Sequence, residues 1–331
     1  MKNIQADIKS GNFKQVYLLY GEEAYLKQQY KQNLVKALNP DGDTMNFNHY
    51  EGKGIDVKQL IDLCETMPFF AERRVVLLED TGFFKNKCEE LADYMKELPD
   101  YLYLVFAETE VDKRNRMYKA VKACGSIAEF IRQDEKTLMR WAAGILGKAG
   151  KKITQRDMEL LLTKTGTDMG NLRMEMEKLI SYTEGRDVVT AEDIEEICTT
   201  QTTNRIFDMV RAVTEKNQKR ALELYYDLLT LKEPPMRILF LLAKQYRQLL
   251  LAKQFAAAGL AQTEIASKLG VPGFVVRNIT TCARAYTISE LEQAVKDFVD
   301  AEESVKTGRL EDKLSVELLI IKYSSKDRKS T

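Results

Sequence analysis

A short apolar run, Val16–Tyr20, is followed at once by Gly21 and then by a helical pattern over residues 22–38. In α/β nucleotide-binding folds this is the position of a phosphate-binding loop. Such a loop needs several glycines, a lysine for the β- and γ-phosphates and a hydroxyl for magnesium. The segment Gly21–Tyr25 has one glycine, two carboxylates and no Gly-Lys-Ser/Thr sequence. Because the required groups are absent and carboxylates repel phosphate, we predict no ATP hydrolysis at this site.

Other candidates for catalysis are equally incomplete. Glu79 and Asp80 follow a strand-like run and resemble an acidic strand end that holds magnesium. Without a phosphate loop to share the ion, a solvated strand end is the simpler interpretation. His49, the single histidine, has no evident nucleophile or metal partner. No G-x-S-x-G or H-E-x-x-H sequence occurs. The sequence therefore predicts no catalytic residue, no cofactor and no metal site.

A second pattern has the spacing of a helix-turn-helix unit: Ala266, then Gly270 four residues later, then Val275 five residues after that. The surrounding stretch is rich in cations, so reading of DNA is the natural rival hypothesis. The second helix, however, offers one cation, Arg277, beside apolar neighbours, which suits packing between helices better than contact with base edges. A DNA-binding regulator using residues 262–284 therefore stays as the alternative function.

A third pattern is an apolar cluster at a helix-to-strand junction. Asp56 can cap a helix with a regular apolar stripe, and Pro68 then disfavours helical geometry at Met67. Adjacent residues on a helix lie about 100° apart, so Phe69 and Phe70 cannot both extend that stripe. The two rings either belong to the local core or face outward as an anchor for a partner.

The elements that must position these residues follow from the apolar periodicity. Five strand-like segments precede residue 134, namely Val16–Tyr20, Thr44–Tyr50, Arg74–Leu78, Leu102–Ala107 and Ser126–Phe130. Helical patterns separate them, over residues 22–38, after a cap at Asp56, over Lys85–Glu97 and after a cap at Asp112. This alternation indicates a mostly parallel five-stranded sheet covered by helices on both faces.

From Asp134 onward the sequence predicts helices and no convincing strand. Thr154 and Thr190 read as helix caps, and a polar run over residues 199–203 is the best linker. The fold class is therefore α/β plus all-α. We predict three domains: an α/β domain over residues 1–133, a small helical domain over 134–203 and a second helical domain over 204–331.

Composition excludes several classes of protein. Among 331 residues the basic and acidic side chains number 50 each, so no global field draws the chain to nucleic acid or membrane. The amino terminus has no secretory pattern, and the longest apolar run is far shorter than the ~20 residues that cross a bilayer. The five cysteines are scattered and unpaired in sequence, which indicates reduced thiols in the cytoplasm.

Several segments, in their order along the chain, resemble the delta-subunit family of the bacterial DNA polymerase III clamp loader. The resemblance covers nearly the whole chain, and the order of the motifs makes it more specific than any one of them. The matching segments are Val16–Leu26, Met67–Leu78, Asp112–Lys119, Thr165–Arg173, Ile206–Asp208 and Lys306–Leu310.

The resemblance implies an AAA+-type parallel five-stranded α/β domain, a helical lid and a helical collar that assembles with other subunits. It implies a non-catalytic subunit of the holoenzyme, which as a whole is a DNA-directed DNA polymerase. The family's hydrophobic plug, which enters a pocket on the sliding clamp, falls on Met67, Phe69 and Phe70. The family often has leucine where this chain has Phe69, so the detailed fit differs. Arg173 falls where ATP-using relatives carry a lid arginine, and is expected to be a structural remnant.

The partners implied by the resemblance are the sliding clamp and the other clamp-loader subunits, both ATP-using and stator, in a hetero-pentamer. Primer–template DNA is expected within the complex, and no membrane is involved. We expect the protein to be cytoplasmic and to help open the clamp ring without hydrolysing ATP itself.

Overall fold

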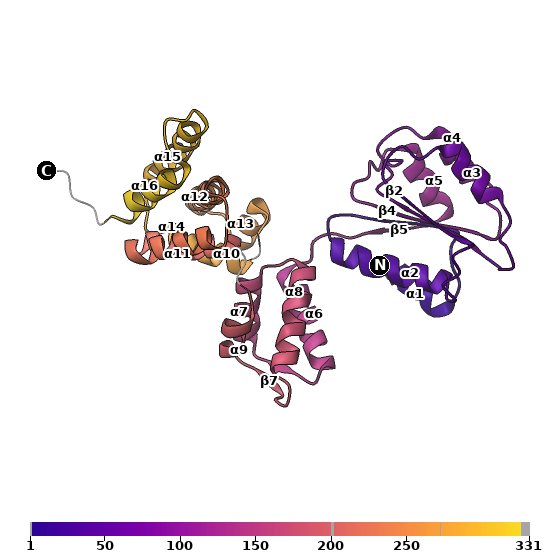
Figure 1. Cartoon of the computed structure of the whole chain (residues 1–331), viewed down its shortest axis with the longest axis horizontal. Helices are drawn as coiled ribbons and strands as arrows, with labels where there is room; N and C mark the ends of the chain where they lie inside the picture. The colour runs from indigo at the N-terminus through magenta and orange to yellow at the C-terminus, as the bar shows by residue number, and fades with distance from the viewer. Residues whose placement is uncertain (1, 200–201, 272, 326–331) are drawn as a thin grey trace. The chain divides into compact units, whose positions relative to one another are not determined.

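The computed structural model describes residues 2–199, 202–271 and 273–325. The chain divides into two compact units, residues 1–133 and residues 134–331. Each unit has its own elements and its own buried core, shown in indigo to purple for the first and magenta to yellow for the second (Figure 1).

The first unit is built on a five-stranded, fully parallel sheet with the strand order β2-β3-β4-β1-β5. The strands are β1 (Val16–Tyr20), β2 (Phe47–Glu51), β3 (Arg74–Glu79), β4 (Leu102–Glu108) and β5 (Ser126–Glu129). The inner strands β1, β3 and β4 are buried along nearly their whole length, as expected for a parallel sheet with two covered faces.

Helices cover both faces of this sheet (Figure 1). On one face α1 (Lys2–Ser10) and α2 (Ala24–Leu38) pack over a core that includes Tyr17, Leu34 and Phe130. The other face is covered by α3 (Val57–Glu65), α4 (Glu89–Tyr94) and α5 (Arg116–Cys124). The predicted parallel five-stranded sheet with helices on both faces is confirmed.

Helix α5 begins later than the sequence indicated. Its cap is Asn115, whose side chain accepts a hydrogen bond from the backbone N–H of Met117. Asp112, the predicted cap, instead accepts from the backbone and guanidinium of Arg114. Both residue types are good helix caps, and Asn115 is held in place by donating to Asn86 O in the segment between β3 and α4.

The second unit opens with a lid group of four helices. These are α6 (Glu135–Lys148), α7 (Gln155–Thr165), α8 (Met169–Tyr182) and α9 (Ala191–Ile197), which share one apolar core. Two strands of two residues each, β6 (Lys152–Ile153) and β7 (Val188–Val189), pair in parallel, so the prediction of no strand after Asp134 was wrong. Strands this short carry no periodicity that a sequence pattern could detect.

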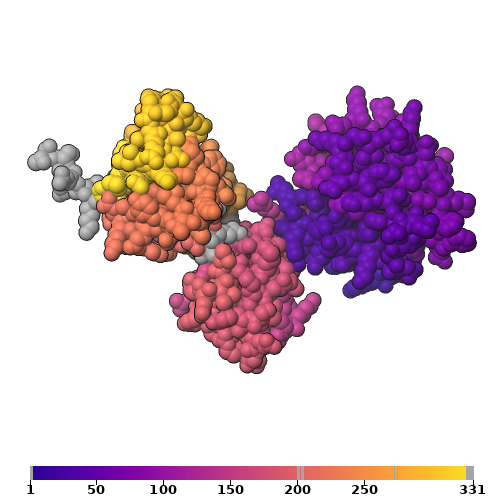
Figure 2. Space-filling model, viewed as in Figure 1, coloured from indigo at the N-terminus to yellow at the C-terminus, as the bar shows by residue number. Residues whose placement is uncertain are grey.

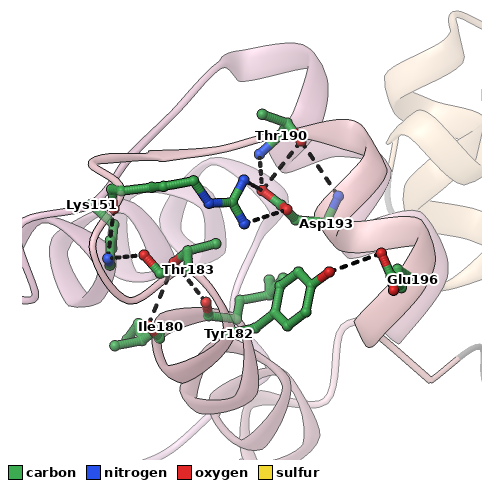
Figure 3. Close-up of polar contacts among 9 residues, drawn as sticks. Lys151, Ile180, Tyr182, Thr183, Thr190, Asp193 and Glu196 are labelled. Atoms are coloured by element: carbon green, nitrogen blue, oxygen red, sulfur yellow. Dashed lines mark hydrogen bonds and ion pairs between the residues drawn. The ribbon is translucent and has the colours of Figure 1, made fainter.

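A polar network fixes the turn between α8 and β7 (Figure 3). Lys151 donates from Nζ to the backbone carbonyls of Thr183 and Arg186, each at 2.6 Å. Asp193 accepts from the Arg186 guanidinium and forms a capping box with Thr190 at the start of α9. These contacts satisfy the carbonyls at the end of α8 and join both short strands to the helices.

The rest of the second unit is a collar group of seven helices around a separate core. They are α10 (Thr202–Thr214), α11 (Gln218–Thr230), α12 (Pro235–Ala257), α13 (Gln262–Leu269), α14 (Gly273–Ala283), α15 (Ile288–Lys306) and α16 (Asp312–Ser324). Helix α12 is central, since it contacts α10 and each of α13 to α16. The predicted division between lid and collar stays a prediction, and residues 200–201 of the predicted linker lie outside the described residues.

Within the described ranges, the structure contains no helix that is both long and apolar enough to cross a membrane.

Candidate functional site

The turn from β1 to α2 is closed by the backbone of Phe130. The Phe130 N–H donates to Tyr20 O at 2.7 Å, and its carbonyl accepts from the Glu23 N–H at 3.0 Å. Gly21 has a φ of +123°, and a Cβ there would lie 2.3 Å from the Phe130 oxygen. Gly21 is thus required by close packing of backbone on backbone. The N–H of Glu23, the residue just before α2, would face a phosphate in a nucleotide-binding site. Here it already donates to the Phe130 carbonyl.

The charged groups at the carboxyl edge of the sheet are also engaged with one another. Lys27 donates to the Glu108 carbonyl at 2.9 Å, and burial lowers the pKa of this lysine. Glu79 pairs with Lys31 and lies 2.9 Å from His49 Nε2, so it is not the solvated strand end that the sequence suggested. In the part of the chain that the structure describes, no cluster of three or more metal-ligating side chains occurs.

The apolar cluster lies on the loop of residues 66–73, between α3 and β3. Its three large side chains face solvent: Met67 is 74% exposed, Phe69 57% and Phe70 95%. The two rings contact each other edge to face, with centroids 4.4 Å apart. The interpretation of these rings as local core is therefore wrong, and Met67, Phe69 and Phe70 form one exposed surface, called the apolar loop below.

The helix before the apolar loop ends as its sequence predicts. Asp56 caps α3 by accepting from the N–H groups of Lys58 and Gln59, and Leu60 and Cys64 are buried. The helix stops at Glu65, and the backbone is extended at the next residue, shortly before Pro68. The rings therefore leave the buried stripe of α3 and emerge at the amino end of the sheet.

The side chain of Asn46 fixes the backbone of the apolar loop at Phe69. Its Oδ1 accepts from the Phe69 N–H at 2.7 Å, and its Nδ2 donates to the Phe69 carbonyl at 2.8 Å. Asn46 is itself only 3% exposed and also donates to Asp43. Hydrogen bonds from Asn46 and from the Met45 N–H hold the pKa of Asp43 below its usual range. Both backbone groups of Phe69 are thus fixed by one buried amide.

Arg74, the first residue of β3, holds the other end of the loop. This buried guanidinium donates from Nε to Thr66 O at 2.9 Å and from Nη2 to Met67 O at 3.3 Å. It also donates to Asn48 Oδ1 at 3.2 Å. A buried charge needs such partners to offset its desolvation, so the loop carbonyls are held tightly to the sheet.

The tip of the loop carries backbone strain. Phe70 has a φ of +49°, in the left-handed region that residues with a Cβ rarely adopt, at a cost of about 1–2 kcal/mol. An almost fully exposed ring gains little from its own fold, so neither packing nor backbone preference explains this phenylalanine. Strained residues held by surrounding contacts are typical of binding sites.

Three residues of this site escaped sequence reasoning. Asn46 and Arg74 act through contacts with segments 23 and 7–8 residues away, and no local pattern marks such partners. Met45 is 65% exposed and precedes Asn46, which places a further apolar side chain on the loop that supports Phe69. The position of Met45 within the predicted second strand obscured it, because β2 begins only at Phe47.

The helix-turn-helix pattern does form two helices, α13 and α14, joined at Gly270 with a φ of +63°. The second helix is a packing helix: Val276 and Ile279 are buried in the collar core, and Val275 packs against both the collar and lid cores. Arg277 lies 3.9 Å from Glu159 of α7. The apolar side of α14 is thus covered by the chain itself, whereas Arg277 is exposed.

A further exposed apolar stripe lies on α16, a helix near the C-terminus whose residues have the yellow colour of Figure 2. Leu314, Leu318 and Ile321 are exposed at spacings of four and three residues, opposite the buried Val316 and Ile320. Helix α16 is thus apolar on two faces, and the outer one has no covering element in the described residues. In the lid group, Arg173 pairs with Glu177 at 2.7 Å one turn later on α8.

Comparison with known proteins finds two family models on this chain. The model described as DNA polymerase III, delta subunit, matches residues 17–130, and the model for the C-terminal domain of the DNA polymerase III delta subunit matches residues 203–323. The two matches cover the apolar loop and nearly all of the collar group, and neither extends over the lid group.

Two curated relatives agree with these matches. The DNA polymerase III subunit delta of Bacillus subtilis (strain 168) is 26% identical over 341 residues, covering 99% of this chain and 98% of its own. The probable DNA polymerase III subunit delta of Aquifex aeolicus (strain VF5) is 22% identical over 270 residues, covering 77% and 75%. The solved structure of the Bacillus subtilis DNA clamp loader delta protein has the same fold, with a TM-score of 0.68 at 24% identity over 98% of this chain and 99% of that one.

Proposed function

Because this chain belongs to the DNA polymerase III delta subunit family, we propose that it is the clamp-loader subunit that binds the sliding clamp. In this role it helps to open the ring for loading onto primed DNA during replication. The solved relative of the same fold is a clamp loader protein. The apolar loop supplies the contact, with Met67, Phe69 and Phe70 as the residues that enter a pocket of the clamp.

The observation that carries this proposal is the exposure of these three side chains on a loop held by buried groups. Exposed apolar side chains that stay outside their own core are typical of protein interaction sites. Burying each ring in a partner contributes ~1.5–3 kcal/mol. Because Asn46 and Arg74 already order the backbone of the loop, little of this gain is spent on ordering it.

The same subunit leaves ATP hydrolysis to its neighbours. The segment Gly21–Tyr25 lacks the lysine and hydroxyl of a phosphate loop. The Glu23 N–H, which would contact a phosphate, donates to Phe130 instead. Titration of the purified chain with ATP and magnesium is expected to give no saturable binding, and a micromolar site would contradict this part of the proposal.

The other partners are the ATP-using and stator subunits of a hetero-pentamer, with primer–template DNA inside the assembly. The exposed stripe of Leu314, Leu318 and Ile321 on α16 supports a helix–helix contact between collar groups. The complex is a cytoplasmic DNA polymerase III holoenzyme, in which this chain has no catalytic residue, cofactor or metal of its own.

The test is binding of the purified chain to its cognate clamp, with and without the rings. The double substitution Phe69→Ala with Phe70→Ala is expected to abolish binding without lowering the melting temperature, because both rings are exposed. The matched control is Ile131→Ala with Met174→Ala, which truncates two other exposed apolar residues. Clamp affinity that survives the first pair, or falls equally with the second, would refute the assignment.

A further inference from the structure

Strand β2 lies at one end of the strand order, beside β3. Hydrogen bonds at both ends of β2 show which of its residues face β3. At the start, the Asn46 carbonyl accepts from the Val75 N–H at 2.9 Å. At the end, the Gly52 N–H donates to the Glu79 carbonyl at 2.9 Å. In a parallel ladder every second residue of a strand bonds to a given neighbour, so the even-numbered residues from 46 to 52 bond to β3.

The odd-numbered residues of β2 point their backbone groups away from the sheet. These residues are Phe47, His49 and Glu51, and within the described ranges no strand pairs with their N–H and C=O groups. Such a row of unpaired groups is a template for pairing with a strand of another chain. Lysine and proline commonly block this pairing at exposed edges, and β2 contains neither of them. The edge of β2 is therefore open to an added strand.

An open groove of about 570 Å³ lies beside this edge, between the sheet and α2. Phe47 and Leu77 of the sheet and Val35 of α2 are among the residues that line it. All three belong to the apolar core on this face or pack against it. Successive side chains of a strand point to opposite faces of its sheet. Every second side chain of an added strand would thus lie on the face of the groove, which offers it an apolar surface.

The same edge is continuous with the apolar loop. Asn46, which directly precedes β2, bonds to both backbone groups of Phe69. Met45, one residue earlier, is exposed. A partner that covers Phe69 and Phe70 therefore lies next to the start of β2, within reach of its free edge.

We propose that the free edge of β2 pairs with an extended segment of the sliding clamp, which adds a further strand to the sheet. Apolar side chains at alternate positions of that segment pack in the groove beside Phe47. This inference rests on the proposed function, because it assigns the edge to the partner of the apolar loop. The two contacts differ in kind. The loop contributes burial of its rings, whereas the edge contributes main-chain hydrogen bonds that fix the orientation of the clamp against the sheet.

Hydrogen exchange of the wild-type chain, alone and bound to its cognate clamp, tests the pairing without any substitution. The amides of Phe47, His49 and Glu51 are expected to exchange fast in the free chain. In the complex they are expected to exchange about tenfold or more slowly, because a hydrogen-bonded amide exchanges only when its bond opens. The amides of Asn48 and Tyr50, which bond to β3, serve as controls and are expected to exchange slowly in both states. Outward amides that keep their free-chain rate in the complex would overturn the inference.

Proline substitution tests the same edge through affinity. His49→Pro removes an outward N–H, whereas His49→Ala keeps it, and both variants lose the contact of His49 Nε2 with Glu79. An edge strand tolerates proline where the N–H faces solvent. We expect His49→Pro to bind the clamp about tenfold more weakly than His49→Ala. Glu51→Pro with Glu51→Ala is the second pair, used if His49→Pro lowers the melting temperature. Equal affinities within the pair would overturn the inference.

The outcomes separate this inference from the proposed function. If Phe69→Ala with Phe70→Ala abolishes clamp binding but the outward amides of the wild-type complex stay unprotected, the loop contact stands and the edge pairing is overturned. Clamp binding that survives the double substitution would refute the loop contact, and protected outward amides in that complex would still support the edge pairing. Protection that appears without clamp and grows with the concentration of the chain would identify a second copy as the added strand, and would overturn the assignment to the clamp.

Discussion

Replacing Asn46 by alanine removes the contact that fixes the apolar loop without touching any residue proposed to enter the clamp. Two hydrogen bonds to the Phe69 backbone are lost, at 2.7 and 2.8 Å. A typical intramolecular hydrogen bond contributes about 0.5–1.5 kcal/mol net, so the pair contributes about 1–3 kcal/mol. The loop then samples several backbone conformations in the free chain, and binding must order it again.

The expected result is a loss of clamp affinity of about 10- to 100-fold, which corresponds to about 1.4–2.8 kcal/mol. Equilibrium binding to the cognate clamp measures this loss, and thermal unfolding measures the accompanying loss of stability. The rings remain present, so most of the loss is expected in a faster dissociation rate.

The matched control is Asn115→Ala in the same unit. Asn115 caps α5 and donates to Asn86 O, and its removal costs about 0.5–2 kcal/mol of stability. It lies at the carboxyl edge of the parallel sheet, opposite the apolar loop, so clamp affinity should stay at the wild-type value. If both variants lose affinity in proportion to their stability, or if Asn46→Ala binds normally, Asn46 does not position the loop.

Two further predictions concern stability. Phe70→Gly is expected to be more stable than Phe70→Ala by about 1 kcal/mol in urea unfolding, because only glycine relieves the φ of +49°; equal stability would show that the loop is unstrained. Burial alone would raise the pKa of Asp193, but the Thr190 N–H and the Arg186 guanidinium together hold it below its ordinary value. This carboxylate therefore stabilises the fold above about pH 4, and that contribution is lost as the pH falls through the lowered pKa. Asp193→Asn should cost about 1 kcal/mol at pH 7 and nothing at the acid limit, as followed by the fluorescence of Trp141 in the lid core; a difference that does not vary with pH would contradict it.

Most of the first unit could be predicted from the sequence because its signals are local. The run Val16–Tyr20 predicted β1 with its bounds, and Asp56 predicted the start of α3. The cap of α5 was misplaced from Asn115 to Asp112, since both are good caps within four residues of one another. A local sequence pattern predicts whether a segment is a helix or a strand more reliably than it predicts the residue at which the segment begins or ends.

The candidate site has features that local sequence patterns could not predict. The identity of Met67, Phe69 and Phe70 as an apolar cluster could be read from the chain, but their exposure could not. The exposure of the three side chains depends on hydrogen bonds from Asn46 and Arg74 to the backbone of the loop. A pattern in the sequence does not show these contacts. A buried amide is a common structural residue, and only its geometry shows that it holds the neighbouring loop outward.

The closure of the β1–α2 turn on Phe130 has a consequence for attempts to engineer this chain. Installing a lysine and a serine after Gly21 would not restore a triphosphate pocket. The incoming anion would compete with a peptide carbonyl already seated on the Glu23 amide, in a space that admits no Cβ at Gly21. For an anion to reach the Glu23 N–H, Phe130, which directly follows β5, would first have to move away from the turn. The proposed absence of ATP hydrolysis is therefore supported by the path of the backbone as well as by the missing side chains.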